Sequence, residues 1–391
     1  MLGSFPLWDL RSKILLTRKD RWATTSWNRT LAYSIARLPS VEILFVSAGA
    51  AVKREQSVRL ADHLTLLTLP YGRVHRSLDL VQSFYQLRER IRTVCDQFRP
   101  HLVHGVGSEH PYAFLASRLG RPAVVTVHGI ARRLFVVQKS AYYGVLAVYE
   151  SLAVRDADAI IAVNEYASTT LQSWNLSAFQ RVVVIPNPLA RPFQASDPTT
   201  WPVRRKRRIA FVGTVTREKG IFDLVRIVAE VCSQPRYEDF ECVIVGRIPR
   251  AKTARQLKTE IGRRRLGSTL KLTGTQSQAE VARILASSRV LILPSKQETA
   301  PMVISEALAC GASVVSYDVG GVRKMLESVP GTDVVPLGNV HEFAQRVAKR
   351  INDFSTEEAI ERRVVSLSRH DAEKVARSTR RVYDFVAGNE C

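Results

Sequence analysis

The 391-residue sequence has few cysteines and no long apolar run. Its five cysteines are widely spaced, and none belongs to a CxxC pair. Disulfide frameworks and thiolate metal centres depend on closely spaced cysteines, so we interpret these as reduced thiols in the cytosol. No apolar stretch approaches the roughly 18 residues that span a membrane, and residues 1–13 lack the apolar core of a signal peptide. We therefore predict a cytoplasmic protein, which would meet a membrane only as a peripheral protein at its inner face.

Acidic residues are also scarce. The 36 Asp and Glu stand against 57 Lys and Arg, which gives a net charge of +21 and a pI near 10.2. Such an excess indicates an acidic partner, which can be nucleic acid, anionic lipid or a phosphorylated substrate. The run Arg204–Arg208 and the basic segment Arg247–Arg265 hold no aromatic side chain on which a base could stack, so nucleic acid is disfavoured. An anionic membrane surface is an expected partner, with Leu78–Phe98 and Ala131–Arg155 as its contacts.

Hydrophobic residues make up 46% of the chain and charged residues 24%, a globular composition. The length exceeds what one core usually supports, so two domains are expected. Short β-branched runs alternate with amphipathic segments, which is typical of parallel sheets covered by helices. The expected strands are Ile14–Leu16, Val41–Val46, Leu102–His104, Ala123–Val127, Ala159–Val163, Val182–Ile185, Arg208–Val212, Glu241–Val245, Leu270–Leu272, Val290–Leu293 and Ser313–Ser316. The clearest helices are Leu78–Phe98 and Ala372–Phe385.

Five prolines between residues 186 and 202 interrupt this alternation and indicate a linker. We therefore predict an α/β protein with a first domain at 1–187, a linker at 188–205, a second domain at 206–370 and a terminal helix at 371–391.

The segment from Val290 to Gly321 is the most informative part of the chain. A buried strand runs into a loop, and a helix starts around Thr299 to Pro301 and stops at Gly311. Thr299 is a suitable N-cap, and Pro301 is tolerated in the first turn. A helix that starts just past the carboxyl end of a parallel strand offers amide hydrogens and a positive dipole to a diphosphate. The amides that would bind it belong to Ala300, Met302 and Val303.

Two glutamates flank this predicted anion site. Glu298 lies in the loop before the helix, and Glu306 lies on the helix one turn beyond Met302. Carboxylates would repel phosphate unless they face hydrogen-bond donors, and sugar and ribose hydroxyls are such donors. The pattern therefore favours a sugar nucleotide over ATP. Two surface acids remain an alternative, as does a glycosidase pair about 5–10 Å apart.

Glu298, seven intervening residues and Glu306, followed by Gly311, resemble the E-x7-E signature of the retaining family 4 glycosyltransferases. The resemblance extends to Phe211–Gly213, Glu218–Gly220, His128–Gly129, Asp156–Ile161 and Pro186–Pro188, and it covers residues 90 to 330 better than the first 80. It implies the GT-B fold, with two Rossmann-like parallel-sheet domains facing across a cleft. The first domain would be on the acceptor side, the second would bind the nucleotide sugar, and the C-terminal helix would cross back to the first.

The resemblance assigns roles to matching positions. Glu298 would contact hydroxyls of the donor sugar, His128 the transferred sugar or the acceptor, and Lys219 the departing diphosphate, which makes these three the catalytic candidates. Glu306 would bind the ribose. The predicted donor-binding residues are Gly213, Thr214, Arg217, Lys219, Arg247, Thr299, Ala300, Pro301, Met302, Val303 and Glu306.

The activity that the resemblance implies is transfer of a hexose-type sugar from a nucleoside diphosphate to a hydroxyl of a glycan or a lipid-linked acceptor. Anomeric configuration would be retained, and no metal or other cofactor would be needed. A non-catalytic GT-B partner or scaffold subunit is the alternative. A sugar-nucleotide epimerase or a phosphorylase is a weaker one, and no motif identifies the pyridoxal-phosphate lysine of a phosphorylase.

The sequence departs from the family at two places. Many members have arginine directly after the first glycine of the phosphate turn, where this chain has Thr214, and Arg217 is the possible substitute. Many members also have a glycine pair after the first strand, where this chain has Lys19–Trp27. The identity of the acceptor therefore cannot be inferred from the resemblance.

Two patterns could suggest a metal site. Asp156 and Asp158 spell a DxD, but their place between a helix end and a buried strand fits a helix stop better. His101, His104 and His110 lack a supporting cysteine or carboxylate pattern. We therefore predict no metal ligands.

Overall fold

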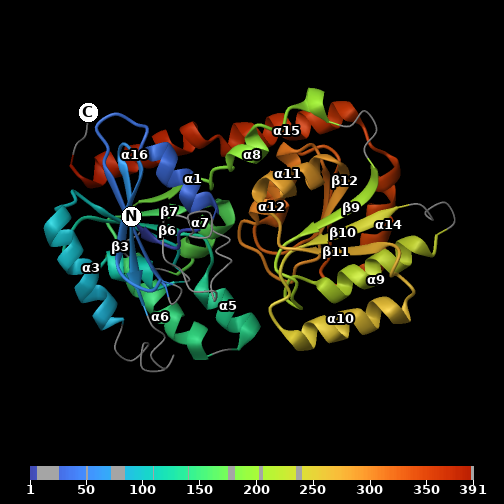
Figure 1. Ribbon diagram of the computed structural model, residues 1–391, viewed down its shortest axis with the longest axis horizontal. Helices are drawn as coiled ribbons and strands as arrows, with labels where there is room; N and C mark the ends of the chain where they lie inside the picture. The colour runs from blue at the N-terminus through green and yellow to red at the C-terminus, as the bar shows by residue number, and fades with distance from the viewer. Residues whose placement is uncertain are drawn as a thin grey trace. The chain divides into compact units, whose positions relative to one another are not determined.

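The computed structural model describes residues 1–6, 26–49, 52–71, 84–108, 110–139, 141–174, 181–201, 206–234 and 240–388 (Figure 1). The chain forms two compact units. Unit 1 comprises Met1–Pro188 and Ala372–Cys391, and unit 2 comprises Leu189–Asp371. The predicted strand Ile14–Leu16 and residues 19–25 of the predicted acceptor loop lie outside the described residues.

Unit 1 is built on an eight-stranded sheet of order β3-β4-β2-β1-β5-β6-β7-β8. All neighbours are parallel except β3, which pairs antiparallel with β4 at the edge. The strands are β1 (Leu2–Gly3), β2 (Ile43–Gly49), β3 (Gln56–Ala61), β4 (Leu64–Pro70), β5 (Val103–Val106), β6 (Ala123–Val127), β7 (Ala159–Ala162) and β8 (Val182–Val184). Strands β5, β6 and β7 are buried along their whole length, as expected for parallel strands covered on both faces.

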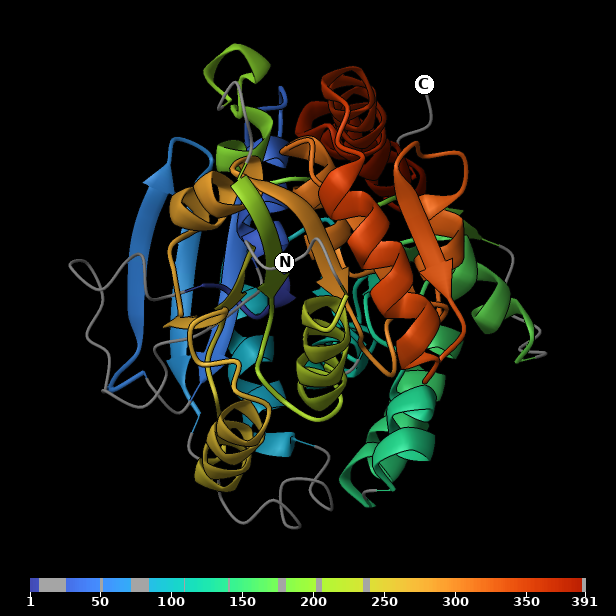
Figure 2. The same ribbon diagram turned by 90° about the vertical axis from the view of Figure 1, so that its right-hand side faces the viewer.

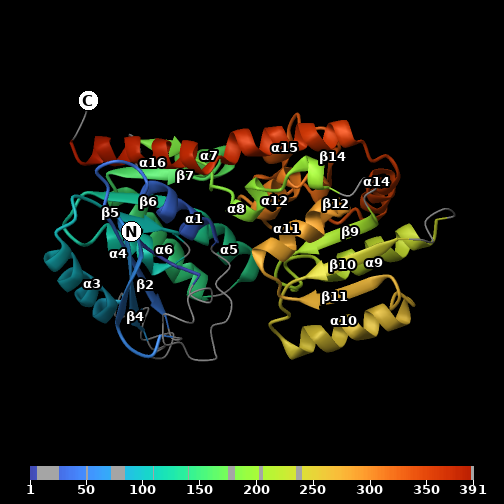
Figure 3. The same ribbon diagram turned by 45° about the horizontal axis from the view of Figure 1, so that its top comes forward.

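Helices cover both faces of this sheet. They are α1 (Ser26–Ile35), α3 (Tyr85–Phe98), α4 (Pro111–Ala116), α5 (Ala131–Gln138), α6 (Ala141–Asp156), α7 (Glu165–Gln172) and α16 (Ala372–Val386). The terminal helix α16 packs beside α1 (Figure 3). Their shared core includes Ile35, Phe45 and Val375, whereas α3 and α4 pack over a second core around Ile91 and Leu115. The predicted return of the C-terminal helix to the first domain is therefore confirmed.

Unit 2 contains a six-stranded, wholly parallel sheet of order β11-β10-β9-β12-β13-β14. Its strands are β9 (Lys206–Val212), β10 (Glu241–Val245), β11 (Leu270–Gly274), β12 (Ser288–Leu293), β13 (Ser313–Tyr317) and β14 (Thr332–Val335). In chain order this is the 3-2-1-4-5-6 arrangement of Rossmann folds. The prediction of two Rossmann-like parallel-sheet domains is confirmed.

The helical elements of unit 2 are α8 (Arg191–Gln194), η2 (Pro198–Thr200), α9 (Ile221–Cys232), α10 (Ala251–Arg263), α11 (Gln278–Ala286), α12 (Met302–Ala309), α13 (Val322–Leu326), α14 (Val340–Asn352) and α15 (Thr356–His370). Helix α14 packs beside α9 (Figure 2). Helix α12 packs against α11 and α15. Among the described residues, no helix has the length and apolarity that a membrane crossing requires.

The expected strands are present wherever the structure describes them, and two of them, β6 and β10, have the predicted bounds. Four strands were not predicted: β1, β3, β4 and β14. Strand β1 has two residues, too short to show a period, and β14 begins with the polar residues Thr332 and Asp333. Strand β4 is rich in leucine, which has no preference for strands, and β3 is a half-exposed edge strand with polar residues. The structure describes residues 84–98 of the predicted helix Leu78–Phe98. Helix α3 covers Tyr85–Phe98, and Phe84 occupies its N-cap position.

Candidate functional site

The predicted donor-site residues of unit 2 gather where the strand order reverses. Strands β9 and β12 are neighbours in the centre of the sheet, and the chain proceeds outward from them in opposite directions. In open α/β sheets, ligands bind at this switch point, beyond the carboxyl ends of the strands. The loops that follow β9 and β12 meet there, since the Lys296 amide donates a hydrogen bond to the Glu218 carbonyl at 2.8 Å.

Two glycines allow neighbouring loops to approach closely. Gly220 has a left-handed φ of 71°, and a Cβ there would lie 1.7 Å from the Pro294 carbonyl oxygen. Gly246 has φ 145°, and a Cβ would lie 1.8 Å from the Gly213 carbonyl oxygen. A side chain at either position would separate two loops at the carboxyl edge of the sheet.

The Gly220→Ala substitution is expected to destabilise the protein by about 2–4 kcal/mol, because it adds a backbone clash to an unfavourable φ. The matched control is Gly262→Ala in α10, where a Cβ meets nothing within 4 Å and φ is not positive. This control should be neutral or slightly stabilising, since alanine favours helix. Urea unfolding followed by circular dichroism measures both, and equal midpoints would contradict the packing described for Gly220.

Lys219 and Glu298 form an ion pair across the two loops. The Lys219 Nζ lies 2.6 Å from Glu298 Oε1, and the side chains are 36% and 8% exposed. The lysine precedes α9, and the glutamate lies between β12 and α12. An ammonium group has three donors, so Lys219 can hold Glu298 and still donate to a phosphate. Two of the three predicted catalytic residues are thus in direct contact.

Helix α12 begins two residues later in the chain than a Thr299 cap requires, so the predicted cap is wrong. Pro301 occupies the N-cap position with an extended ψ of 105° and makes no side-chain cap. The reason is steric, since the residue before a proline is held away from helical backbone angles. The first helical hydrogen bond at this end runs from the Ile304 amide to the Pro301 carbonyl. The amides of Met302 and Val303 precede it and have no acceptor within the helix.

Glu306 differs from Glu298 in its surroundings. It lies on α12 one turn beyond Met302, and no described residue pairs with its carboxylate. Burial raises the pKa of Glu306 to about 7. A half-buried carboxylate without a described partner favours a ligand that brings hydrogen-bond donors.

The remaining predicted donor residues lie along the same edge with different environments. Thr214 follows Gly213 at the end of β9, and the Arg247 carbonyl accepts from the Val215 amide at 2.8 Å. The Arg247 side chain is exposed. The Arg217 guanidinium donates to Gln256 of α10 at 2.8 Å and lies over the Phe222 ring of α9. Its role as the substitute phosphate ligand stays a prediction.

His128 belongs to unit 1 and follows β6, with its ring 5.7 Å from that of Trp27. The turn after it is held by Glu150, a buried residue of α6 that sequence reasoning missed. The Glu150 carboxylate accepts from Ser108 Oγ at 2.6 Å and from the Ala131 amide at 3.0 Å. Its signal in the sequence is a single acid inside the otherwise uncharged stretch 141–154. Glu150 therefore supports the loop that carries His128.

The two patterns considered for metals have structural roles. Asp158 accepts a hydrogen bond from the Ala123 amide at 2.7 Å, and Asp156 pairs with Arg118. His104 is buried between the Tyr383 hydroxyl and the Thr126 hydroxyl, both at 2.6 Å, and burial lowers its pKa to about 3. Within the part of the chain that the structure describes, no three His, Cys, Asp or Glu residues are grouped as metal ligands would be.

Comparison with known proteins agrees with this architecture. The 2-deoxystreptamine glucosyltransferase of Streptomyces kanamyceticus is 29% identical over 255 residues, which are 61% of this chain and 64% of that protein. The match thus spans less than two thirds of that relative's length. The structure of sucrose-phosphate synthase from Thermosynechococcus elongatus superposes with a TM-score of 0.82 at 16% identity, covering 100% of this chain and 98% of that one.

The structure of Anabaena HepE, in complex with UDP and glucose, gives a TM-score of 0.70 at 17% identity, and the match covers 98% of each chain. At such identities the structures establish a shared fold. Residues 30–190 match the family described as Glycosyltransferase Family 4, and residues 199–364 match the family described as Glycosyl transferases group 1. The chain therefore carries both domains of the GT-B glycosyltransferases and belongs to that superfamily.

Proposed function

We propose that this protein transfers a sugar from a nucleoside diphosphate to a hydroxyl of a glycan or lipid-linked acceptor, with retention of anomeric configuration and without a metal ion. The observation that carries the proposal is the contact between Lys219 and Glu298 at the switch point of the unit 2 sheet, next to the start of α12. Basic and acidic groups that lie together there suit a ligand with both a diphosphate and hydroxyls.

The reaction breaks the bond between the anomeric carbon and the diphosphate oxygen and forms one to the acceptor oxygen. Negative charge develops on the departing diphosphate, and the Lys219 ammonium and the amides at the start of α12 would stabilise it. The acceptor hydroxyl would attack from the face that the diphosphate leaves, and its proton would pass to a leaving oxygen. Glu298 would orient the sugar hydroxyls, and His128 would contact the transferred sugar.

Glu306 would accept hydrogen bonds from the ribose. It also weighs against a non-catalytic scaffold, because a half-buried carboxylate that has a raised pKa and no described partner costs stability when no ligand uses it. A scaffold would have no need for that cost.

A thermal-shift panel of UDP, GDP, ADP and their sugars tests this proposal. One nucleotide is expected to raise the melting temperature, by an amount equivalent to about 2.7 kcal/mol at a hundredfold excess over Kd. The shift should be lost in Glu306→Ala. If no nucleotide stabilises the wild-type protein, the scaffold alternative replaces the enzyme.

We also propose that unit 1 attaches to an anionic membrane through α5. Phe135 and Val136 are 44% and 67% exposed, and Arg133 and Lys139 are exposed beside them. Apolar side chains among basic ones suit the interface of an anionic bilayer. For the helix Leu78–Phe98, the other contact considered, the described part α3 exposes Tyr85 and Phe98.

In a sedimentation assay, the protein is expected to bind phosphatidylglycerol-containing vesicles more than phosphatidylcholine vesicles at moderate salt. Arg133→Glu with Lys139→Glu should abolish this preference, because each basic residue near the surface contributes about 1 kcal/mol. Lys53→Glu with Arg54→Glu, in the exposed turn between β2 and β3, is the charge-matched control. Equal sedimentation with both lipids would remove the membrane proposal.

A further inference from the structure

Helix α15 presents a row of polar side chains to α12, the helix that carries Glu306. Its members are spaced so that they share one face of α15. They are Arg362, Arg363, Ser366 and His370, and each makes a hydrogen bond to α12 or to the turn that follows it. Packed helices usually meet through apolar side chains. This contact therefore fixes α12 by directed bonds as well as by shape.

The bonds nearest the candidate site converge on Ser305, the residue before Glu306. Ser366 Oγ donates to the Ser305 carbonyl at 2.7 Å, and His370 Nε2 lies 2.8 Å from Ser305 Oγ. Ser305 and Ser366 are 2% and 1% exposed. Buried hydrogen bonds of this kind are costly to leave unmade.

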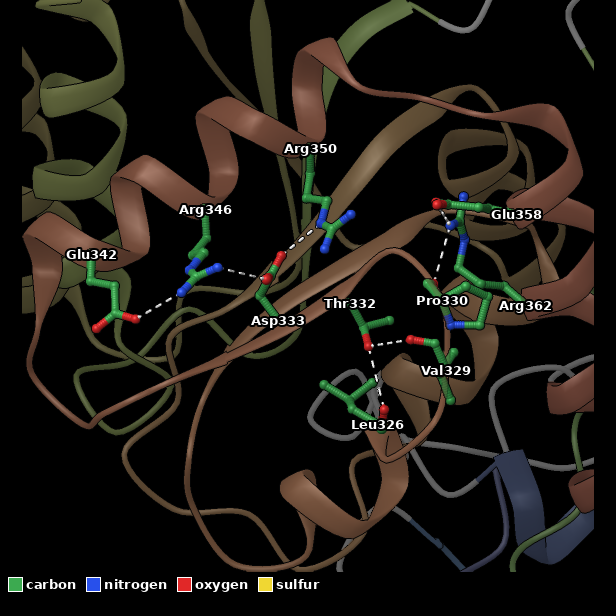
Figure 4. Close-up of polar contacts among 10 residues, drawn as sticks. All are labelled: Leu326, Val329, Pro330, Thr332, Asp333, Glu342, Arg346, Arg350, Glu358 and Arg362. Atoms are coloured by element: carbon green, nitrogen blue, oxygen red, sulfur yellow. Dashed lines mark hydrogen bonds and ion pairs between the residues drawn. The ribbon is translucent and has the colours of Figure 1, made fainter.

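The other end of α12 is held by two arginines. Arg362 is fully buried and donates from Nη2 to the Gly311 carbonyl at 3.1 Å and from Nη1 to the Pro330 carbonyl at 3.2 Å. Figure 4 shows its guanidinium between Pro330 and Glu358, beside the separate cluster of Asp333 with Arg346 and Arg350. These contacts join the turn that follows α12 to the loop that precedes β14.

Arg363 reaches the same helix end from α15. It donates to the Ala309 carbonyl at 2.8 Å and to the Gln194 carbonyl of α8 at 2.6 Å. Polar contacts thus hold α12 from Ser305 to Gly311, a span that includes Glu306.

The rotation of α12 about its axis decides where Glu306 points. Successive residues of a helix are about 100° apart around the axis. Because Ser305 is tied to α15, the Glu306 side chain is directed away from that contact. A small rotation of α12 would displace a carboxylate that has no described partner of its own to hold it.

We propose that Ser366 and His370 are positioning residues for donor binding, which hold Ser305 so that the Glu306 carboxylate meets the ribose hydroxyls. This inference rests on the proposed function. It adds a set of residues outside the ligand site that determine nucleotide affinity through the orientation of one helix.

The test uses the full-length protein and calorimetric titration with UDP, GDP and ADP. Ser366→Ala is expected to raise the Kd of the bound nucleotide about tenfold, the cost of one buried hydrogen bond. Ser366→Thr keeps the hydroxyl and should restore most of the affinity. Ser368→Ala, on an exposed position of the same helix, is the matched control and should leave Kd within twofold. His370→Leu should weaken binding, and His370→Gln, which keeps a polar group near the Nε2 position, should weaken it less.

The 2′,3′-dideoxy analogue of the nucleotide separates positioning from general damage. It lacks the hydroxyls that Glu306 would bind, so Ser366→Ala should change its Kd by less than twofold. Equal weakening of nucleotide and analogue would overturn the inference while leaving the proposed function intact. If Ser366→Ala does not fold, the same comparison in His370→Leu decides. If the wild-type protein binds no nucleotide, the proposed function fails, and this inference fails with it.

Discussion

Lys219→Ala is expected to lower kcat about 10²–10³-fold with the donor that the nucleotide panel identifies. The reason is the loss of a cation at the position where charge develops on the leaving diphosphate, an effect comparable to removal of one oxyanion-hole donor. The KM for the donor should change less, because the ground-state diphosphate keeps the amides of α12. Initial rates at saturating donor and acceptor provide the measurement.

Two variants make the Lys219 result specific. Lys219→Arg keeps the charge and should recover part of the rate. Lys296→Ala removes an exposed lysine from the neighbouring loop and should leave kcat unchanged. Because Lys219→Ala also leaves the carboxylate of Glu298 without its ion pair, melting temperatures must accompany the rates. A kcat within tenfold of wild type in a folded Lys219→Ala protein would exclude the proposed role.

Glu306→Gln is expected to weaken nucleotide binding and, at pH 8, to stabilise the empty protein. The pKa of Glu306 is about 7 in the folded protein and near 4.5 when unfolded, so folding favours the protonated form. Ionisation therefore lowers the free energy of unfolding as pH rises from about 4.5 to 7. Above pH 7 the cost is at most about 3 kcal/mol, and glutamine removes it. Below pH 4.5, Glu306 is protonated in the folded and in the unfolded protein. The difference in the free energy of unfolding between wild type and Glu306→Gln should therefore vanish.

Urea unfolding of both proteins at pH 5 and pH 8 measures this effect. The stabilisation by glutamine should be larger at pH 8. Glu327→Gln is the control, and its effect on the free energy of unfolding should have the opposite sign. The ion pair with Lys324 lowers the pKa of Glu327, so loss of this ion pair should destabilise the protein slightly. Wild-type nucleotide affinity should also fall as pH drops below 7, by up to about tenfold per unit. A pH-independent affinity would mean that the ionised carboxylate is not the ribose ligand.

The sequence predicted the α/β class, most of the strands and the restart of the alternation after the proline-rich linker, because these depend on local periodicity and turn residues. It also predicted Glu298, Glu306 and Lys219 as a set, through a resemblance and through the chemistry of a helix N-terminus. A strand such as β6 is readable from five residues because its buried position needs a continuous apolar run.

The order of the strands was not readable, because pairing joins segments far apart in the chain. That order places the loop of Lys219 beside the loop of Glu298, although 78 residues separate them along the chain. The Thr299 cap was mispredicted because the constraint that Pro301 places on Ala300 competes with cap preference. The hydrogen bonds of Ser366 and His370 with Ser305 of α12 could not be predicted either, because they also join segments far apart in the chain. Local sequence determined which residues can bind phosphate and hydroxyls, and only the tertiary contacts decided which of them meet and how Glu306 is held.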